Sequence, residues 1–278
     1  MIKEPQKTYL LELLTELGDF GNDFVLAGGQ AMHFMLNKVR PTKDFDFVLD
    51  VYSLREKSHK VADLLSKLDY KVDPKARNFQ FAKQIPNSNE VMRIEFLGCE
   101  ENRKSKNKRV KIQDGLHARD CEGADIVLRE SFNELLRGNL PSGISVEANI
   151  RIIQPQALVM LKLLAMDDRY ENIRGPKEAR HDREEAIIHA GDILSIIHAN
   201  IGKGDFPVMF WRQYGSQQDL KRRSIDILHR YFENIGSPGV QLYTEYVHTE
   251  NQAIDRDEEQ LLINRAIRET NILINEYK

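Results

Sequence analysis

The chain has 278 residues, of which 41% are hydrophobic and 30% charged, and its formal net charge is −3. These values fit one or two globular domains with buried cores, and they exclude an overall electrostatic bias toward nucleic acid or anionic membranes. The cysteines Cys99 and Cys121 provide neither a disulfide framework nor a zinc-finger spacing, and no stretch approaches the ~18 apolar residues of a membrane span, so we expect a cytoplasmic protein without membrane association.

The first predicted elements are a helix, a short strand and a second helix. Residues 6–17 place leucines on one broad stripe, as in an amphipathic helix. Residues 24–27 form an apolar run that fits a buried strand, and Gly28 and Gly29 separate it from a short helix predicted at residues 30–38. Because glycine has no Cβ and a helix N-terminus carries partial positive charge, this turn is a candidate anion site, although a Gly-Gly pair is also common in ordinary turns.

Two aspartates, Asp44 and Asp46, alternate with Phe45 and Phe47 in the next segment. A strand has a side-chain period of two, so both carboxylates would share one face and both rings the other. The two aspartate Cα atoms would then lie roughly 6.6 Å apart, close enough for both side chains to bind one Mg²⁺ ion or a close metal pair. Mg²⁺ in turn favours phosphate oxygens. The alternative is a strand that binds no ligand and faces solvent with its polar side, because such a strand shows the same alternation.

The rest of the first half predicts a sheet with helices packed on it. Residues 53–68 read as one helix capped by Ser53. Residues 78–85 and 90–98 alternate on either side of a turn-forming link and predict a β-hairpin, and residues 123–128 and 143–153 are further strand candidates. We therefore predict a mixed sheet flanked by helices, an α/β or α+β domain that covers residues 1–153.

Glu95 is the best candidate for a third acid at the aspartate pair. Two-metal sites for phosphoryl transfer commonly need a further carboxylate, and the alternation of residues 90–98 places Arg93 and Glu95 on the face away from the core. The alternative is an ordinary exposed glutamate paired with Arg93. Asp50 is a poorer choice, because it lies about 13 Å beyond Asp46 along a strand.

The second half, residues 154–278, predicts an all-helical domain. Helices are expected at residues 155–170, 177–199, 217–235 and 254–276, with glycine-rich breaks between them. Lys162 interrupts the apolar face of the first of these helices, and Arg169 follows two turns later on the same face. Together they could neutralise a triphosphate, although Lys162 could equally extend its ammonium to solvent at a domain edge.

The segment AGGQAMHF…RPTKDFDFVL resembles the signature of the nucleotidyltransferase superfamily, in which a Gly-Gly or Gly-Ser pair precedes Asp-x-Asp. More narrowly, it is similar to bacterial nucleotidyltransferases of the abortive-infection toxin kind and their uncharacterised relatives. The matching residues are Gly28, Gly29, Gln30, Ala31, Arg40, Thr42, Asp44 and Asp46. The run KLLAMDDR resembles the Lys-x-x-Ala-x-x-x-Arg of the same group. Where those relatives often carry Lys-Asp on the next helix, this chain has His181 and Asp182.

The resemblance implies transfer of a nucleoside monophosphate from an NTP, ATP among the candidates, to a hydroxyl of an acceptor that could be RNA, protein or a small molecule. It implies one or two Mg²⁺ ions, replaceable by Mn²⁺, bound by the catalytic acids Asp44, Asp46 and Glu95. The residues expected to contact the NTP are Gly28, Gly29, Gln30, Thr42, Lys43, Lys162 and Arg169. The toxin-type relatives imply a toxin–antitoxin or phage-defence role with an antitoxin partner.

Two alternatives stay open at this point. Six basic residues lie between positions 101 and 111, and they predict either an arm that touches RNA or a solvated hairpin tip. No aromatic residue is interleaved to stack on bases, which favours the hairpin tip. The whole chain could also be a catalytically silent nucleotide- or partner-binding module that keeps the nucleotidyltransferase fold.

Overall fold

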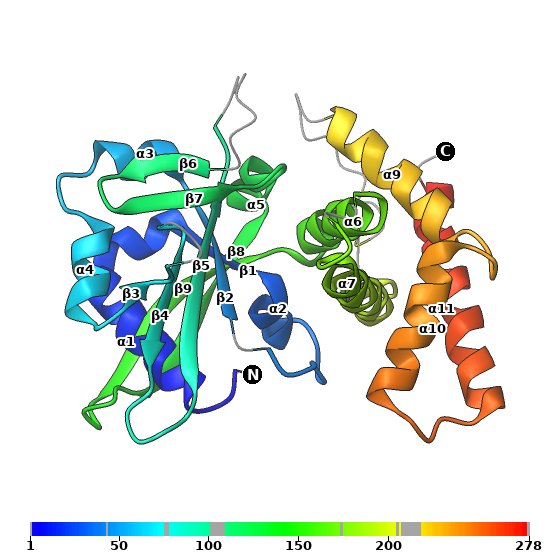
Figure 1. Cartoon of the computed structure of the whole chain (residues 1–278), viewed down its shortest axis with the longest axis horizontal. Helices are drawn as coiled ribbons and strands as arrows, with labels where there is room; N and C mark the ends of the chain where they lie inside the picture. The colour runs from blue at the N-terminus through cyan, green and yellow to red at the C-terminus, as the bar shows by residue number, and fades with distance from the viewer. Residues whose placement is uncertain are drawn as a thin grey trace. The chain divides into compact units, whose positions relative to one another are not determined.

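A computed structural model of the chain describes residues 2–42, 44–74, 78–100, 109–172, 175–203, 206 and 218–276. The predicted NTP contact Lys43 and most of the basic segment 103–111 lie outside these residues. The chain divides into two compact units, Met1–Gln154 and Pro155–Lys278. Figure 1 shows a sheet with helices in the first unit and helices in the second.

The described residues of the first unit form a nine-stranded mixed sheet. The strands are β1 (Phe24–Ala27), β2 (Asp44–Leu49), β3 (Lys71–Val72), β4 (Gln80–Gln84), β5 (Val91–Gly98), β6 (Arg109–Gln113), β7 (Leu116–Asp120), β8 (Ser131–Asn139) and β9 (Ser145–Ile153). The main strand order is β3-β4-β5-β2-β1-β9-β8, and β7 pairs with β5 and β6 outside this order. Three strand pairs, β2–β5, β1–β9 and β5–β7, are parallel, and the others are antiparallel. The predicted mixed sheet is therefore confirmed.

Short helices accompany this sheet. They are α1 (Gln6–Leu17), α2 (Gly28–Ala31), α3 (Val51–Glu56), α4 (Val61–Lys67) and α5 (Ala124–Arg129), with 3₁₀ turns at Gly18–Asp23 and Met32–Phe34. The leucine stripe of α1 is buried, as its periodicity predicted, and α1 packs on β8 and β9.

The alternation of β2 separates an aromatic core from a polar face. Phe45 and Phe47 have no exposed surface, whereas Asp44 and Asp46 are partly exposed. The Phe47 and Phe96 rings meet Phe24 edge-on, at centroid distances of 5.9 and 5.8 Å. Because side chains alternate along a strand, this packing on one face sends the two aspartates to the other, as predicted.

Three local predictions for residues 30–68 were wrong. Residues 53–68 form two helices, because the polar stretch 55–60 offers no apolar side chain to a core and Lys57, with an extended backbone, forms an ion pair with Asp23. The cap of α3 is Asp50, whose side chain accepts from the Ser53 amide at 3.0 Å, so Ser53 is not the cap. The helix after the glycine pair is also shorter than predicted, since regular turns end at Phe34.

Residues 123–128, predicted as a strand, form most of helix α5. Gly123 adopts a left-handed conformation with φ 86° just before the first turn, and Asp125 pairs with Arg129 at 2.6 Å across one turn. Ile126 and Val127 are buried by this helix, so a short apolar run was compatible with either element.

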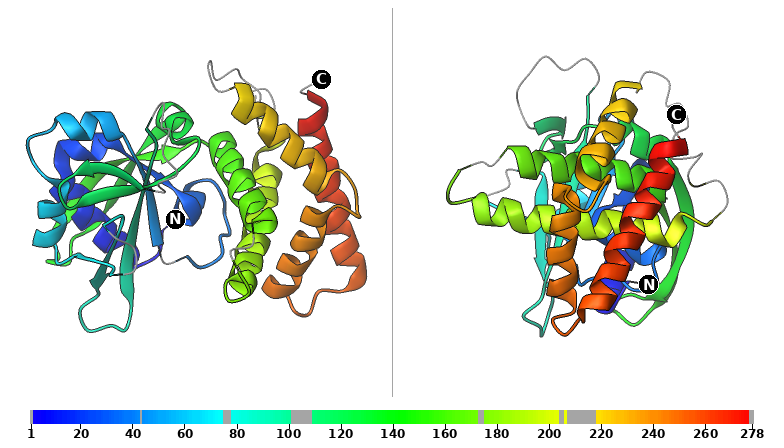
Figure 2. Two further views of the ribbon diagram at one scale, coloured as in Figure 1. Left: turned by 45° about the horizontal axis from the view of Figure 1, so that its top comes forward. Right: turned by 90° about the vertical axis from the view of Figure 1, so that its right-hand side faces the viewer.

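In the second unit, every regular element among the described residues is a helix. Its helices are α6 (Pro155–Glu171), α7 (Ala179–Asn200), α9 (Gln218–Phe232), α10 (Pro238–Glu250) and α11 (Arg256–Glu276). α6 and α7 run side by side, as do α10 and α11 (Figure 2). The sequence interpretation missed α10, which begins with Pro238 in its first turn, because the preceding glycine-rich stretch reads as a longer break. Within the described residues, no helix is both long enough and apolar enough to cross a membrane.

Candidate active site

The glycine pair lies against the aspartate strand. Strands β1 and β2 are antiparallel, with Ala27 opposite Asp46, so Gly28 follows at the level of the Asp46 carboxylate. A Cβ built on Gly28 would lie 1.8 Å from Asp46 Oδ2, and the φ of Gly28 is +61°. Both the close approach and the backbone conformation therefore require glycine at this position.

A second set of contacts ties the chain before β2 to the start of α2. A Cβ on Gly29 would lie 2.9 Å from Thr42 Oγ1, so this glycine also allows a close approach. The Gln30 side chain, which is only 1% exposed, donates from Nε2 to the Thr42 carbonyl oxygen at 3.0 Å. Gln30 thus holds the segment that leads into the aspartate strand.

The sheet brings Glu95 next to Asp46. Strands β2 and β5 are parallel and in register, with Asp46 opposite Glu95 and Asp44 opposite Arg93. Cross-strand partners point to the same face of a sheet, so Asp44, Asp46 and Glu95 share the face away from the aromatic core. The Glu95 side chain is 13% exposed, whereas that of Asp44 is 46% exposed.

Arginine side chains contact two of the three acids. Arg119 Nε on β7 lies 2.7 Å from Glu95 Oε1, and Gln80 on β4 donates from Nε2 to Glu95 Oε2 at 3.3 Å. Arg93 pairs with Asp44 at 3.9 Å, so the pairing of Arg93 with Glu95 considered from the sequence is not the one observed. Arg119 and Gln80 were missed because their approach to Glu95 depends on which strands flank β5.

The thiol and the imidazole near this face are shifted toward their neutral forms. Burial raises the pKa of the Cys121 thiol to about 12, with Cys99, Asp120 and Asp46 adding to the effect and Arg119 opposing it. Burial also lowers the pKa of His117 on β7, aided by the charges of Arg109 and Lys111. At neutral pH neither group adds charge to the acidic face.

Lys162 and Arg169, the predicted triphosphate contacts, both pair with carboxylates of α7. Lys162 is 5% exposed, and its Nζ donates to Asp192 Oδ2 at 2.7 Å. Arg169 donates to Asp182 Oδ1 at 2.9 Å, and Asp182 has no exposed surface. Burying these charges is tolerable because each has an opposite charge within hydrogen-bonding distance. Their contact with an NTP stays a prediction.

The model of a nucleotidyltransferase family matches residues 6–190, well over half of the chain. The chain belongs to this nucleotidyltransferase family. The matched residues include the glycine turn, the acidic face and the helix that carries Lys162 and Arg169. The family model thus covers the elements on which the chemistry was predicted from the sequence.

Comparison with solved structures adds two Helicobacter pylori proteins. The nucleotidyltransferase-family chain is 13% identical to JHP933, with 100% of this chain and 95% of that chain covered and a TM-score of 0.38. It is 14% identical to a second protein, proposed to be a nucleotidyltransferase, with 99% and 97% covered and a TM-score of 0.38. No curated protein matches the chain significantly.

The residues on the acidic face of this family member fit a Mg²⁺ ion that is partly coordinated by its substrate. Asp44 and Asp46 provide hard oxygen donors, and the absent Cβ of Gly28 makes room for the Asp46 carboxylate against the glycine turn. Mg²⁺ typically takes one or two carboxylates and completes its shell with phosphate oxygens and water. Among the described residues no three His, Cys, Asp or Glu side chains form a complete metal-binding group, so Glu95 as a third ligand stays a prediction.

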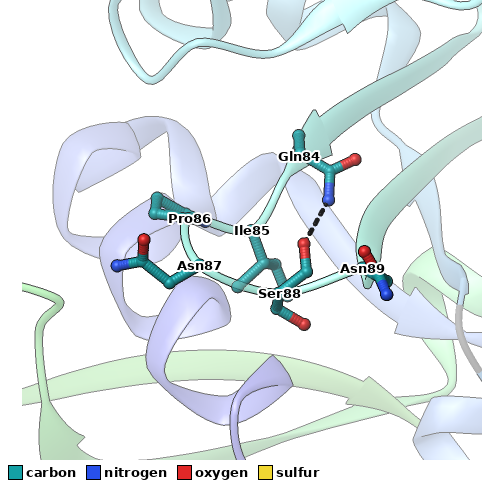
Figure 3. A pocket seen from close by; sticks show the side chains of 6 residues that line it. All are labelled: Gln84, Ile85, Pro86, Asn87, Ser88 and Asn89. Carbon is teal, nitrogen blue, oxygen red and sulfur yellow. Dashed lines mark hydrogen bonds between the residues drawn. The ribbon is translucent and has the colours of Figure 1, made fainter.

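A separate shallow hollow lies at the β4–β5 turn (Figure 3). Its lining consists of Gln84, Ile85, Pro86, Asn87, Ser88 and Asn89. The Gln84 amide spans the turn and donates to the Ser88 carbonyl oxygen at 2.7 Å. Glu95 lies four residues beyond Val91, which pairs with Gln84, so this turn is roughly 13 Å along the strand from the acidic face. The hollow contains no titratable group and is not part of the candidate site.

Proposed function

We propose that this protein transfers a nucleoside monophosphate from an NTP to a hydroxyl group of an acceptor, in a Mg²⁺-dependent reaction. The observation that carries the proposal is the approach of Gly28 to Asp46, on the sheet face that Asp46 shares with Glu95. This arrangement places a backbone that can approach phosphate next to carboxylates that can bind its counter-ion. Membership of the nucleotidyltransferase family supports the same chemistry.

In the proposed reaction, Gly28 and Gly29 bring their backbone close to the triphosphate, while Gln30 and Thr42 hold the segment leading into β2. Asp44 and Asp46 would bind Mg²⁺, which when bound neutralises phosphate charge and supports departure of pyrophosphate. Glu95 accepts the proton of the acceptor hydroxyl. The hydroxyl oxygen then forms a bond to the α-phosphorus as the bond to the β-phosphate oxygen breaks.

The nucleotide contacts of Lys43, Lys162 and Arg169 belong to this proposal as predictions. So do the acceptor, which could be RNA, a protein or a small molecule, and a toxin role with an antitoxin partner. Growth arrest on expression of the chain alone, relieved by an Asp46→Asn substitution, would support the toxin role. Unimpeded growth with measurable transferase activity would contradict it.

The test of the reaction uses the purified chain, each α-labelled NTP, Mg²⁺ or Mn²⁺, and a cell extract as the source of acceptors. We expect label on one class of acceptor and release of pyrophosphate, both abolished by EDTA and by Asp46→Asn. Asp50→Asn is the matched control, because Asp50 caps α3 and asparagine caps a helix almost equally well. Undiminished labelling by Asp46→Asn, with circular dichroism showing a native fold, would refute the mechanism.

The arginine pairs favour one competing function, a nucleotide- or partner-binding module without turnover. Arg119 contacts Glu95 and Arg93 contacts Asp44, so part of the acidic charge is already compensated. Such a module would bind an NTP in titration calorimetry, yet release no pyrophosphate with any extract. If the wild-type chain releases pyrophosphate and Asp46→Asn abolishes this release, the binding module without turnover is excluded.

A further inference from the structure

We propose that Arg119 is a positioning residue that acts through Glu95; the inference rests on the proposed function and extends its site to strand β7. Arg119 Nε lies 2.7 Å from Glu95 Oε1, and Gln80 Nε2 donates to Glu95 Oε2 at 3.3 Å. Both oxygens of a largely buried carboxylate are therefore contacted by side chains from β4 and β7, which pair with β5 at successive positions. This arrangement restricts rotation of the Glu95 side chain.

Strand register explains why Arg119 reaches Glu95. Strands β5 and β7 are parallel, with Leu97 opposite Arg119, so Arg119 lies two residues further along the sheet than Glu95. An arginine side chain is long enough to cover that offset, and it brings the guanidinium charge within ion-pair distance of the carboxylate. Arg119 is 44% exposed and keeps part of its hydration, whereas Glu95 is 13% exposed and needs a partner more strongly.

The need for such a partner comes from the neighbouring acids. Asp46 is the cross-strand partner of Glu95, and Asp44 lies on the same face. Carboxylates so placed repel one another, and repulsion would turn Glu95 away from Asp46. The Arg119 charge offsets this repulsion, so Glu95 can stay directed toward the place where Asp44 and Asp46 would bind Mg²⁺.

A double-mutant cycle separates action through Glu95 from a direct contact with substrate. The four proteins are wild type, Arg119→Gln, Glu95→Gln and the double variant, all as the full chain. The first measurement is Mn²⁺ affinity by electron paramagnetic resonance with a non-hydrolysable NTP analogue, and the second is kcat and KM for the NTP. Arg137→Gln is the matched control, because Arg137 Nε contacts Glu147 Oε1 at 2.6 Å between β8 and β9, where no site residue lies.

We expect Arg119→Gln to weaken Mn²⁺ binding and lower kcat by about tenfold each, in the range seen when a residue supporting a metal ligand is removed. The KM for the NTP should change by less than about twofold, because no substrate contact is lost. In the Glu95→Gln background the Arg119 substitution should have no further effect. Arg119→Lys, which keeps the charge, should recover part of the loss and serves if the glutamine variant fails to fold.

Two results would overturn the proposal. An increase in KM at constant kcat that persists in the Glu95→Gln background would assign Arg119 to direct phosphate binding. Unchanged Mn²⁺ affinity and kcat in Arg119→Gln would remove any role. If the wild-type chain itself turns over no NTP, the proposed function fails, while the Mn²⁺ measurements still decide whether Arg119 acts through Glu95.

Discussion

The backbone of Gly28 and the carboxylate of Asp46 approach so closely that a single added methyl group on Gly28 would lie 1.8 Å from Asp46 Oδ2. The contact exists because antiparallel pairing sets Ala27 opposite Asp46, so the chain turns directly over the carboxylate. Two parts of the sequence signature that are far apart along the chain are thereby one structural unit.

Gly28→Ala should displace the Asp46 carboxylate and reduce nucleotidyl transfer by at least about tenfold, since even small misplacement of a reacting group is costly. The left-handed φ of +61° should also lower the free energy of unfolding by about 1–2 kcal/mol. Gly143→Ala is the control: Gly143 has φ +84° but no atom within 4 Å of an added Cβ. Equal activity losses in the two variants would show that the Asp46 contact is not the cause.

Gln30→Met keeps the side-chain volume but removes the hydrogen bond to the Thr42 carbonyl. We expect a loss of about 1 kcal/mol in the free energy of unfolding, because a partly buried acceptor loses its donor. The segment before β2 should loosen, which we expect to raise the KM for the NTP. Gln84→Met removes a comparable amide contact to Ser88 in the β4–β5 turn, and its KM should match wild type. Similar KM values for all three proteins would contradict a role of Gln30 at the site.

Lys162→Met should destabilise the protein by about 3–5 kcal/mol, because it removes the ammonium partner of the fully buried Asp192. The double variant Lys162→Met, Asp192→Leu should regain much of that loss in urea titrations. Arg180→Met, which breaks an exposed pair with Glu184, should leave the stability unchanged. If the stable double variant also binds NTP as tightly as wild type, the predicted triphosphate contact of Lys162 is wrong.

Cys121 should be an unreactive thiol in the folded protein. Its pKa of about 12 leaves little thiolate at pH 8, so alkylation of Cys121 in a Cys99→Ser background should be on the order of 10³-fold slower in the native than in the urea-unfolded protein. The thiol pKa is higher in the folded than in the unfolded chain, so the unfolded chain loses its proton first as the pH rises. The free energy of unfolding should therefore fall as the pH rises above about 8.5. Equal native and unfolded rates would contradict this assignment.

Local patterns predicted much of the fold and the candidate site. The leucine stripe of α1 and the alternation around Asp44 depend only on helical and strand periods, so they could be interpreted without any tertiary information. The same alternation placed Glu95 on the polar face of its strand. Short apolar runs were less informative: residues 123–128 fit a strand or a helix by pattern, and packing selected the helix.

The sequence by itself determined which side chains share a face, because a strand period acts between neighbours along the chain. Only the tertiary structure decided which faces meet: parallel pairing of β2 with β5 sets Glu95 opposite Asp46, and pairing of β7 with β5 brings Arg119 to Glu95. It also gave Lys162 its partner Asp192, thirty residues away along the chain. These pairings follow from the packing of the whole sheet or helical unit. They depend on contacts between segments that are far apart along the chain, so the pattern within one segment does not predict them.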